Sequence, residues 1–270
     1  MLKYQRNSED QWMLHARPYS VLARDYDCAL GSKQFQHVRD LFERLVREFA
    51  IPFSSAADVG CGTGLFARHL RRRWRVPVFA VDRSSAMLRV AKRNCWGTGV
   101  HLLQQDLRSL RLPVQVDLIT ANFDTMNHLV APGDLACALR RIAENLRPGG
   151  NFIFDFLTHC QMMAGSQPYL RRLRGVSGEV QQWIHWDPAR HMLSIRMVHG
   201  FPAFPAPSIE LHRERAYTPE EMGQALSEAG LTVRAVRDAV TLRPAVTCAP
   251  RLLVVAQKRA SGRCKSFSNP

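Results

Sequence analysis

The sequence of 270 residues lacks the features of a membrane or secreted protein. It contains no apolar run close to the length of about 20 residues that a transmembrane helix needs. Its first residues, MLKYQRNSEDQWM, lack the apolar core of a signal peptide. It also lacks a C-x-x-C pair: its seven cysteines, an odd number, argue against both a disulfide framework and a zinc site. We therefore expect a cytoplasmic protein with no membrane segment and no bound metal.

Acidic residues are in the minority, and 23 Asp and Glu against 37 Lys and Arg give a formal net charge of +14. Such an excess is common in nucleic-acid-binding proteins. The basic residues are nevertheless spread along the chain, without a stretch in which they alternate with stacking aromatic residues. The densest run, RRRWR at 71–75, ends a helical pattern, where the helix dipole favours cations. We therefore favour a solvated basic surface, and a nucleic-acid partner remains the alternative.

The most informative stretch is 56–82, AADVGCGTGLFARHLRRRWRVPVFAVD. A short apolar run breaks at Gly60, Gly62 and Gly64, a helical pattern follows, and a second apolar run ends at Asp82. This order of strand, glycine loop, helix, strand and acid is half of a nucleotide-binding α/β sheet. The glycines let the loop approach a ligand, and the helix N-terminus presents unpaired N–H groups to it. The carboxylate of Asp82 can accept hydrogen bonds from a ribose diol.

The motif D-V-G-C-G-T-G at 58–64 resembles motif I of the class I S-adenosylmethionine (SAM)-dependent methyltransferases, in particular the bacterial small-molecule type. A strand-like run that ends at Asp106 and the L-R-P-G-G turn at 146–150 add to the resemblance. It implies that SAM is the cofactor, with its methionine portion on the glycine loop, its ribose on Asp82 and its adenine amine on Asp106. The motifs cover roughly residues 50–157, and the order of elements extends the likeness to the C-terminus.

The resemblance also implies a wider set of cofactor contacts. Tyr26 lies in a Y…A..YD segment that folds over the cofactor in many small-molecule methyltransferases; packing of Tyr19 and Tyr26 on the sheet edge is the alternative. Met87 is expected against the adenine, with an ordinary place in the core as the alternative. The expected cofactor-binding residues are Tyr26, Asp58, Gly60, Cys61, Gly62, Asp82, Met87, Asp106, Leu107 and Asn122.

The candidate acceptor site is F-D-x-x-N-H-L at 123–129. It resembles the loop that leaves the fourth strand in bacterial small-molecule N- and O-methyltransferases and runs beneath the reacting methyl group. Asn127 is therefore expected to bind the substrate, and His128 is the candidate catalytic base. His212 is a second candidate base and an expected substrate contact. Because the chain has 10 histidines, a structural role for either one is the alternative.

The chain is predicted to insert a cap into a two-part core. Residues 158–217 alternate like strands where the minimal fold would have a helix, so we expect an antiparallel cap over the loop at 123–129. Its polar face of Glu210, His212 and Glu214 is expected to be solvated, and H-x-E at 212–214 lacks the P-C-x-x-C of a zinc deaminase. The predicted divisions are an N-terminal helical segment (1–50), the methyltransferase core (51–157 and 218–258), the cap (158–217) and a disordered tail (259–270).

These patterns predict an α/β fold: a Rossmann-like, seven-stranded, mostly parallel sheet with one antiparallel strand, plus a small antiparallel β cap inserted after strand five. The predicted function is methyl transfer from SAM to an N or O nucleophile of a small molecule. Such an in-line transfer depends more on positioning than on side-chain chemistry. The alternatives are an RNA methyltransferase, an NAD-linked oxidoreductase, favoured by the G-x-G-x-x-A spacing of Gly62, Gly64 and Ala67, and a non-catalytic SAM-binding module. The acceptor's identity and the oligomeric state stay open.

Overall fold

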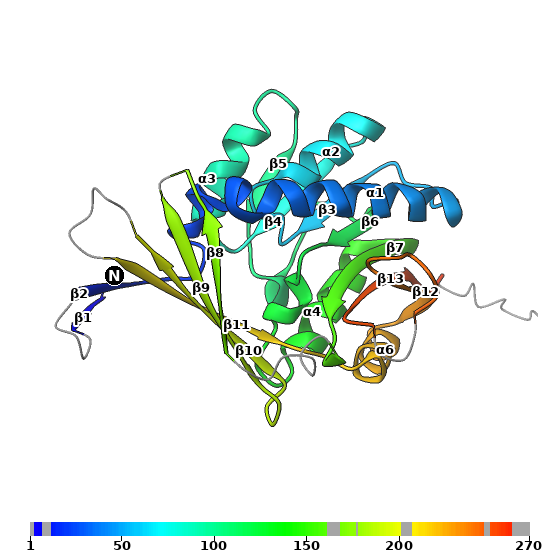
Figure 1. Ribbon diagram of the computed structural model, residues 1–270. Helices are drawn as coiled ribbons and strands as arrows, with labels where there is room; N and C mark the ends of the chain where they lie inside the picture. The colour runs from blue at the N-terminus through cyan, green and yellow to red at the C-terminus, as the bar shows by residue number, and fades with distance from the viewer. Residues whose placement is uncertain are drawn as a thin grey trace, which may run out of the picture.

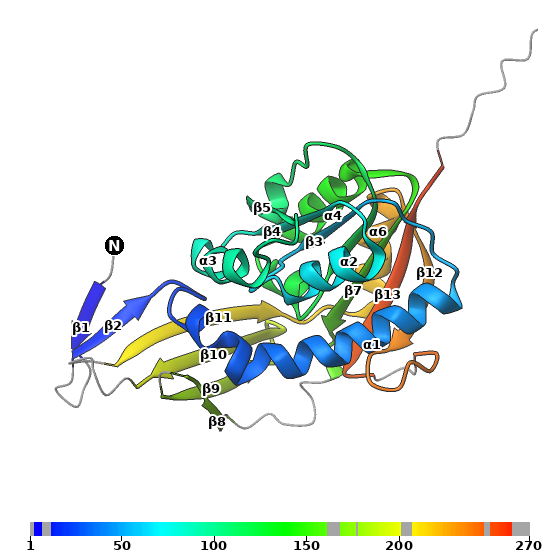
Figure 2. The same cartoon turned by 90° about the horizontal axis from the view of Figure 1, so that it is seen from above.

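The computed structural model describes residues 3–6, 12–160, 168–176, 178–200, 207–245 and 249–260. These residues form two sheets that lie next to each other, a larger one flanked by helices and a smaller one that extends to the left in Figure 1. In the view from above, the long helix α1 (Ser32–Glu48) runs from the smaller sheet along the larger one (Figure 2).

The larger sheet has seven strands in the order β12-β13-β7-β6-β3-β4-β5. β13 is antiparallel to both of its neighbours, whereas the pairs from β7 to β5 are all parallel. The predicted sheet, with its single antiparallel strand, is therefore confirmed. Its strands are β3 (Ala56–Val59), β4 (Val78–Asp82), β5 (His101–Gln104), β6 (Val116–Ala121), β7 (Leu146–Leu157), β12 (Leu231–Asp238) and β13 (Arg251–Lys258).

Helices cover both faces of this sheet. On one face, α1 and α2 (Leu65–Trp74) pack apolar side chains such as Phe42 and Phe66 against the strands. On the other face lie α4 (Asp134–Asn145) and α6 (Pro219–Glu228), while α3 (Ser85–Asn94) lies beside α2. Each helix buries one apolar stripe, so the parallel strands are buried on both sides, as parallel sheets usually are.

The smaller sheet, here called the cap sheet, has the order β1-β2-β11-β10-β9-β8. Its last four strands form the antiparallel cap that the alternation over 158–217 predicts. The other two come from the N-terminus, and β2 pairs in parallel with β11. The bounds are β1 (Lys3–Arg6), β2 (Trp12–Ala16), β8 (Tyr169–Arg174), β9 (Glu179–Asp187), β10 (Met192–His199) and β11 (Ser208–Arg215).

The prediction of a helical segment over 1–50 is therefore wrong for its first part. Two short strands precede three helical elements, namely η1 (Leu22–Arg24), η2 (Asp27–Gly31) and α1. Strands of four and five residues are too short to show a clear period of two, and their pairing partner β11 lies far along the chain. Of the predicted disordered tail at 259–270, residues 261–270 lie outside the described part.

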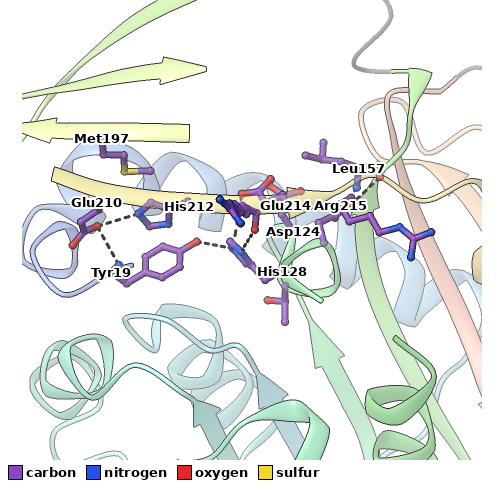
Figure 3. Close-up of polar contacts among 12 residues, drawn as sticks. Tyr19, Asp124, His128, Leu157, Met197, Glu210, His212, Glu214 and Arg215 are labelled. Carbon is purple, nitrogen blue, oxygen red and sulfur yellow. Dashed lines mark hydrogen bonds and ion pairs between the residues drawn. The ribbon is translucent and has the colours of Figure 1, made fainter. Parts of the chain in front are cut away.

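The cap sheet lies at the carboxyl ends of the core strands, where α/β folds bind ligands. The contact is made at η4 (Thr125–His128), the turn after β6. The Asn127 side chain donates to the carbonyls of Leu157 (3.0 Å) and Arg215 (2.7 Å) and accepts from the Leu157 N–H (2.9 Å). It thus joins the end of β7 at Leu157 to the end of β11 at Arg215, two residues that lie close together in Figure 3, and β11 of the cap sheet contacts η4.

Two further observations concern the described residues only. None of their helices is both long and apolar enough to span a bilayer. Their five cysteines, Cys28, Cys61, Cys95, Cys137 and Cys160, form no disulfide.

Candidate functional site

The glycine loop after β3 lines a cavity of about 180 Å³, here called the loop cavity. Gly60, Gly62 and Gly64 all have positive φ, between 53° and 78°. A Cβ on Gly60 would overlap the hydroxyl and methyl groups of Thr125, whereas a Cβ on Gly62 would meet nothing within 4 Å. Gly60 is therefore required for packing against η4, and Gly62 leaves the wall of the cavity open to a ligand.

Asp82, at the end of β4, is fixed by two backbone donors. Its Oδ2 accepts from the Gly62 N–H (2.9 Å) and its Oδ1 from the Ser84 N–H (2.7 Å). Burial raises the pKa of Asp82, while these two hydrogen bonds favour its ionised form. Each carboxylate oxygen keeps acceptor capacity on the cavity side, so the geometry suits the two hydroxyls of a ribose.

Asp58 lies beneath the loop and is almost fully buried. Its Oδ1 accepts from the Thr120 hydroxyl (2.8 Å) and the Asn122 amide (3.3 Å). Its Oδ2 is buried with no hydrogen-bond partner among the described residues, and burial raises the pKa of Asp58 to about 7. An unpaired buried carboxylate oxygen beside a cavity suits a cationic donor. The ammonium group in the methionine portion of SAM is such a donor.

We expect SAM affinity to fall as the pH drops below about 7, by up to about tenfold per pH unit. The sign follows from the raised pKa of Asp58: in the free protein the carboxyl takes up a proton below pH 7, and that proton must leave before an ammonium group can pair with it. Calorimetric titrations across this range would measure the slope. Asp58→Asn is the control, because its SAM affinity should no longer change with the titration of residue 58. Any pH dependence of SAM affinity that remains in this variant would report the titration of Asp82, whose pKa is also raised.

The far wall of the loop cavity is formed by residues of α3 and of the segment after β5. Met87 is 2% exposed and packs beside Tyr19 and Tyr26, so it belongs to the core and to the cavity wall at once. Asp106 is held by Arg108 through Nε (2.8 Å) and Nη2 (2.7 Å), and these hydrogen bonds lower the pKa of Asp106. If an adenine amine binds Asp106 as the sequence predicts, it would share this carboxylate with a guanidinium.

All ten predicted cofactor-binding residues line the loop cavity. The sequence therefore grouped them correctly in space, although they come from five segments of the chain. Residues that it did not single out also line this cavity, among them Thr63, Arg108 and Thr125. Arg108 could have been suspected only from its place two residues after Asp106.

A second cavity of about 480 Å³, here called the cap cavity, lies between the cap sheet and the core strand ends. Tyr19, Tyr26 and Phe123 line both cavities and so form their common wall. The rest of the cap cavity is lined mainly by apolar side chains, many of them from β9 and β10, and by a few polar and charged ones. The charged residues are Asp124, Arg171, Glu214 and Arg251.

His128 lies at this common wall and contacts Tyr19. The Tyr19 hydroxyl is 2.7 Å from His128 Nε2, and Nδ1 is 3.3 Å from the Arg213 carbonyl (Figure 3). Burial lowers the pKa of His128 to about 4, so the ring is neutral at pH 7. Because a carbonyl only accepts, the consistent assignment has Nδ1–H donating to Arg213 and Nε2 accepting from the tyrosine.

Asn127 and His212 differ from the prediction, since neither lines either cavity. Asn127 is fully buried, and its side-chain amide donates hydrogen bonds to the main chain of β7 and β11. His212 is 1% exposed, lies 3.0 Å from Glu210 through Nε2, and packs edge-on against the Tyr19 ring. Both residues therefore position the wall of the site, and neither contacts the space a substrate would fill.

The expected solvated face of β11 is instead buried. Glu210 is 0% exposed, and its carboxylate accepts from the N–H groups of Tyr19 (3.1 Å), Val21 (2.5 Å) and Leu22 (3.2 Å). These groups belong to the segment that leads into η1, so one carboxylate of the cap sheet fixes the chain around Tyr19. Burial opposes the ionisation of Glu210, but hydrogen bonds from His212 and Val21 outweigh it and lower its pKa.

The floor of the cap cavity is a charged cluster that sequence reasoning missed. Arg251, at the start of β13, pairs with Asp124 (2.7 Å) and with Asp155. Asp124 follows Phe123, and both have positive φ (60° and 57°), a conformation that costs about 1–3 kcal/mol per non-glycine residue. The ion pair with Arg251 offsets part of this strain. Asp124 was visible within the F-D-x-x-N-H-L motif, but no local signal marks Arg251.

A mostly parallel seven-stranded sheet with one antiparallel strand, a glycine loop after β3 and an acid at the end of β4 define a class I SAM-dependent methyltransferase. The model of a family described as "Methyltransferase domain" matches residues 56–150. Within the described residues, no group of three His, Cys, Asp or Glu side chains is placed to hold a metal ion.

Comparisons with known proteins agree with this class. Over 171 residues the chain is 33% identical to a carboxy-S-adenosyl-L-methionine synthase of Shewanella piezotolerans. This match covers 56% of this chain and 67% of the relative. Over 218 residues it is 27% identical to dTDP-3-amino-3,6-dideoxy-alpha-D-glucopyranose N,N-dimethyltransferase of Streptomyces fradiae, covering 78% and 84%. The fold matches that of a SAM-dependent methyltransferase from Clostridium acetobutylicum with a TM-score of 0.75, at 21% identity over 87% of this chain and 96% of that one. The chain belongs to the class I SAM-dependent methyltransferases.

Proposed function

We propose that this methyltransferase transfers a methyl group to a nitrogen or oxygen nucleophile of a small molecule that binds in the cap cavity. The observation that carries the proposal is the common wall of Tyr19, Tyr26 and Phe123 between the two cavities. A cofactor on the glycine loop and an acceptor beneath the cap would meet at this wall. The similarity to an amino-sugar N,N-dimethyltransferase supports a small-molecule acceptor.

The residues of the loop cavity suit SAM. Asp82 can hold the ribose, the unpaired Oδ2 of Asp58 can receive the ammonium group, and Gly62 leaves room for the methionine portion. When bound, SAM supplies an activated methyl group on a sulfonium. The protein excludes water by the cap and orients the acceptor, and such positioning supplies much of the rate of an in-line transfer.

His128 acts in this proposal as a positioning residue. Its Nε2 lone pair is occupied by the Tyr19 hydroxyl, and burial lowers its pKa to about 4, so it is a weak proton acceptor at neutral pH. The pair instead fixes Tyr19 at the common wall. The basic run of α2 lies at the C-terminal end of that helix, whereas the glycine loop leads into the N-terminal end. The basic run is therefore remote from both cavities. An RNA acceptor therefore has no support from the site.

We expect Asp82→Ala to weaken SAM binding by about 1–3 kcal/mol, since the ribose hydroxyls lose their acceptor and Gly62 its anchor. Isothermal calorimetry with SAM, S-adenosylhomocysteine and NAD would measure it. Asp117→Ala is the matched control, because Asp117 lies at the amino end of β6, away from both cavities. An unchanged SAM affinity in Asp82→Ala, or clear binding of NAD by the parent protein, would refute the cofactor assignment.

A further inference from the structure

Glu214, the last acidic residue of β11, carries a buried carboxyl group at the edge of the cap cavity. Its side chain is 9% exposed, and its Oε1 lies 3.8 Å from Nε2 of His128. No hydrogen bond joins its carboxyl group to any residue in the described part of the chain. Because Glu214 lines the cap cavity next to the wall shared with the loop cavity, a ligand can reach it. A buried carboxyl that lacks partners favours a ligand with N–H or O–H donors.

The charges around Glu214 decide which donor fits. From the core, Asp124, Asp155 and Arg251 form a cluster with more carboxylates than cations, and Asp124 opposes the ionisation of Glu214. From the N-terminal segment come the hydroxyls of Tyr19 and Tyr26. Across the cap sheet, Glu214 is level with two apolar residues, Leu193 on β10 and Trp186 on β9.

The remaining cation of the cap cavity cannot neutralise Glu214. Arg171 is exposed on β8, which is three strands away from β11. Three strand spacings amount to about 14 Å. The end of the cavity near Glu214 thus has more carboxyl groups than cations, which favours a cationic ligand.

We propose that Glu214 binds the amino group of the methyl acceptor and takes its proton, so that the nucleophile is an amine. This inference rests on the proposed function and narrows it from nitrogen or oxygen to nitrogen. The position of Glu214, beside His128 and the wall of Tyr19 that separates the cavities, places the amine at the side from which it would meet the methyl group.

The proton transfer is balanced as follows. At neutral pH the buried carboxyl of the free protein is protonated, because its pKa is raised to about 8, and it gives this proton to solvent when the ammonium group binds. An N–H bond of the ammonium group breaks, its electron pair stays on nitrogen, and the proton moves to Glu214 Oε1 or Oε2. The freed pair forms the bond to the methyl carbon, while the pair of the carbon–sulfur bond stays on sulfur. The methylated product carries the positive charge that the sulfonium loses, and Glu214 is left protonated, as it was before the amine bound.

Burial makes this transfer easy in energetic terms. Desolvation, and next the nearby Asp124, raise the pKa of Glu214 to about 8, much closer to the pKa of an alkyl ammonium group than an exposed carboxyl would be. In an apolar cavity, a neutral carboxylic acid beside a neutral amine also costs less than an ion pair. A hydroxyl acceptor would gain little from the same carboxyl, because an alcohol is a far weaker acid than an ammonium group.

Binding of cyclohexylamine and of cyclohexanol, which have nearly the same shape, tests the proposal. We expect the parent protein to bind the amine at least tenfold more tightly than the alcohol and to release about one proton per amine, measured by calorimetry in two buffers of different ionisation enthalpy. Glu214→Gln should weaken amine binding at least tenfold and change alcohol binding less than threefold. Glu144→Gln is the matched control, because the Glu144 side chain is exposed on α4, and it should behave like the parent.

SAM affinity of Glu214→Gln, measured in parallel, separates this inference from the function it rests on. If SAM binds and the alcohol binds as well as the amine, or if amine binding releases no proton, the role of Glu214 is overturned and the methyltransferase assignment stands. If the parent fails to bind SAM, the proposed function itself falls. The proton count uses only the parent protein, so it decides the matter even if the variant folds poorly.

Discussion

Gly60→Ala is expected to reduce SAM affinity by about a hundredfold or more and to lower the free energy of unfolding by about 2–4 kcal/mol. The alanine Cβ would overlap the Thr125 side chain, and φ of 65° is unfavourable for any residue with a Cβ. Relief requires the loop to move away from η4. The Gly62 N–H that anchors Asp82 would move with it, and so would the floor of the loop cavity.

Two further variants separate the overlap from the backbone strain. Gly97→Ala has the same sign of φ (68°) with nothing within 4 Å, so it should cost stability by strain alone and leave SAM binding unchanged. Thr125→Ala removes the overlapping atoms and should restore part of the affinity when combined with Gly60→Ala. The parent, Gly60→Ala, Thr125→Ala and the double variant form a double-mutant cycle, in which calorimetry measures SAM affinity and urea unfolding measures stability. Full SAM affinity in Gly60→Ala would contradict the proposed contact between loop and cofactor.

The core and most of the lining of the loop cavity could be predicted because their signals are local. Gly60, Gly62 and Asp82 belong to one strand–loop–helix–strand unit, whose geometry follows from glycine conformation and the parallel sheet alone. Asp106 follows the next strand of the same sheet, so the carboxyl ends of neighbouring strands bring these residues to one edge. All of them line the loop cavity.

The acceptor side could be predicted only in outline. Alternation along β11 correctly placed Glu210, His212 and Glu214 on one face, but it could not show that another segment covers that face. The N-terminal segment does so, with donors from Tyr19 to Leu22, and its pairing partner is distant in sequence. Alternation alone therefore predicts a solvated face on β11, whereas the structure shows a buried one.

Neighbouring residues of a short helical turn posed the same difficulty. In η4, Asn127 points into the core and His128 points to the cavity, although both are polar and adjacent. A turn of four residues is too short to reveal its buried side by periodicity. The partners that decide the matter, Leu157 and Arg215 for Asn127 and Tyr19 for His128, come from three other segments.

Glu210→Ala is expected to lower the free energy of unfolding by about 3–5 kcal/mol and to reduce methyl transfer by at least tenfold. The change leaves the N–H groups of Tyr19, Val21 and Leu22 and the ring of His212 without their acceptor. The segment would detach to reach water, and Tyr19 would leave its place at the common wall. The loss should appear in kcat and in the affinity for the acceptor, since both depend on that wall, and less in SAM affinity.

The pH dependence of unfolding tests whether the carboxylate acts in its ionised form. Because the pKa of Glu210 is lowered in the folded state, its contribution is present above the unfolded pKa of about 4.5 and is lost as the pH falls through the folded pKa. Glu210→Gln, which keeps the size but not the charge, should therefore be less stable than the parent at neutral pH and approach it in acid. Glu179→Gln, exposed on β9 of the same sheet, should follow the parent throughout. A Glu210→Gln protein with parental stability and kcat at neutral pH would show that the N-terminal segment is held by other contacts, and that Tyr19 does not depend on the cap sheet for its position.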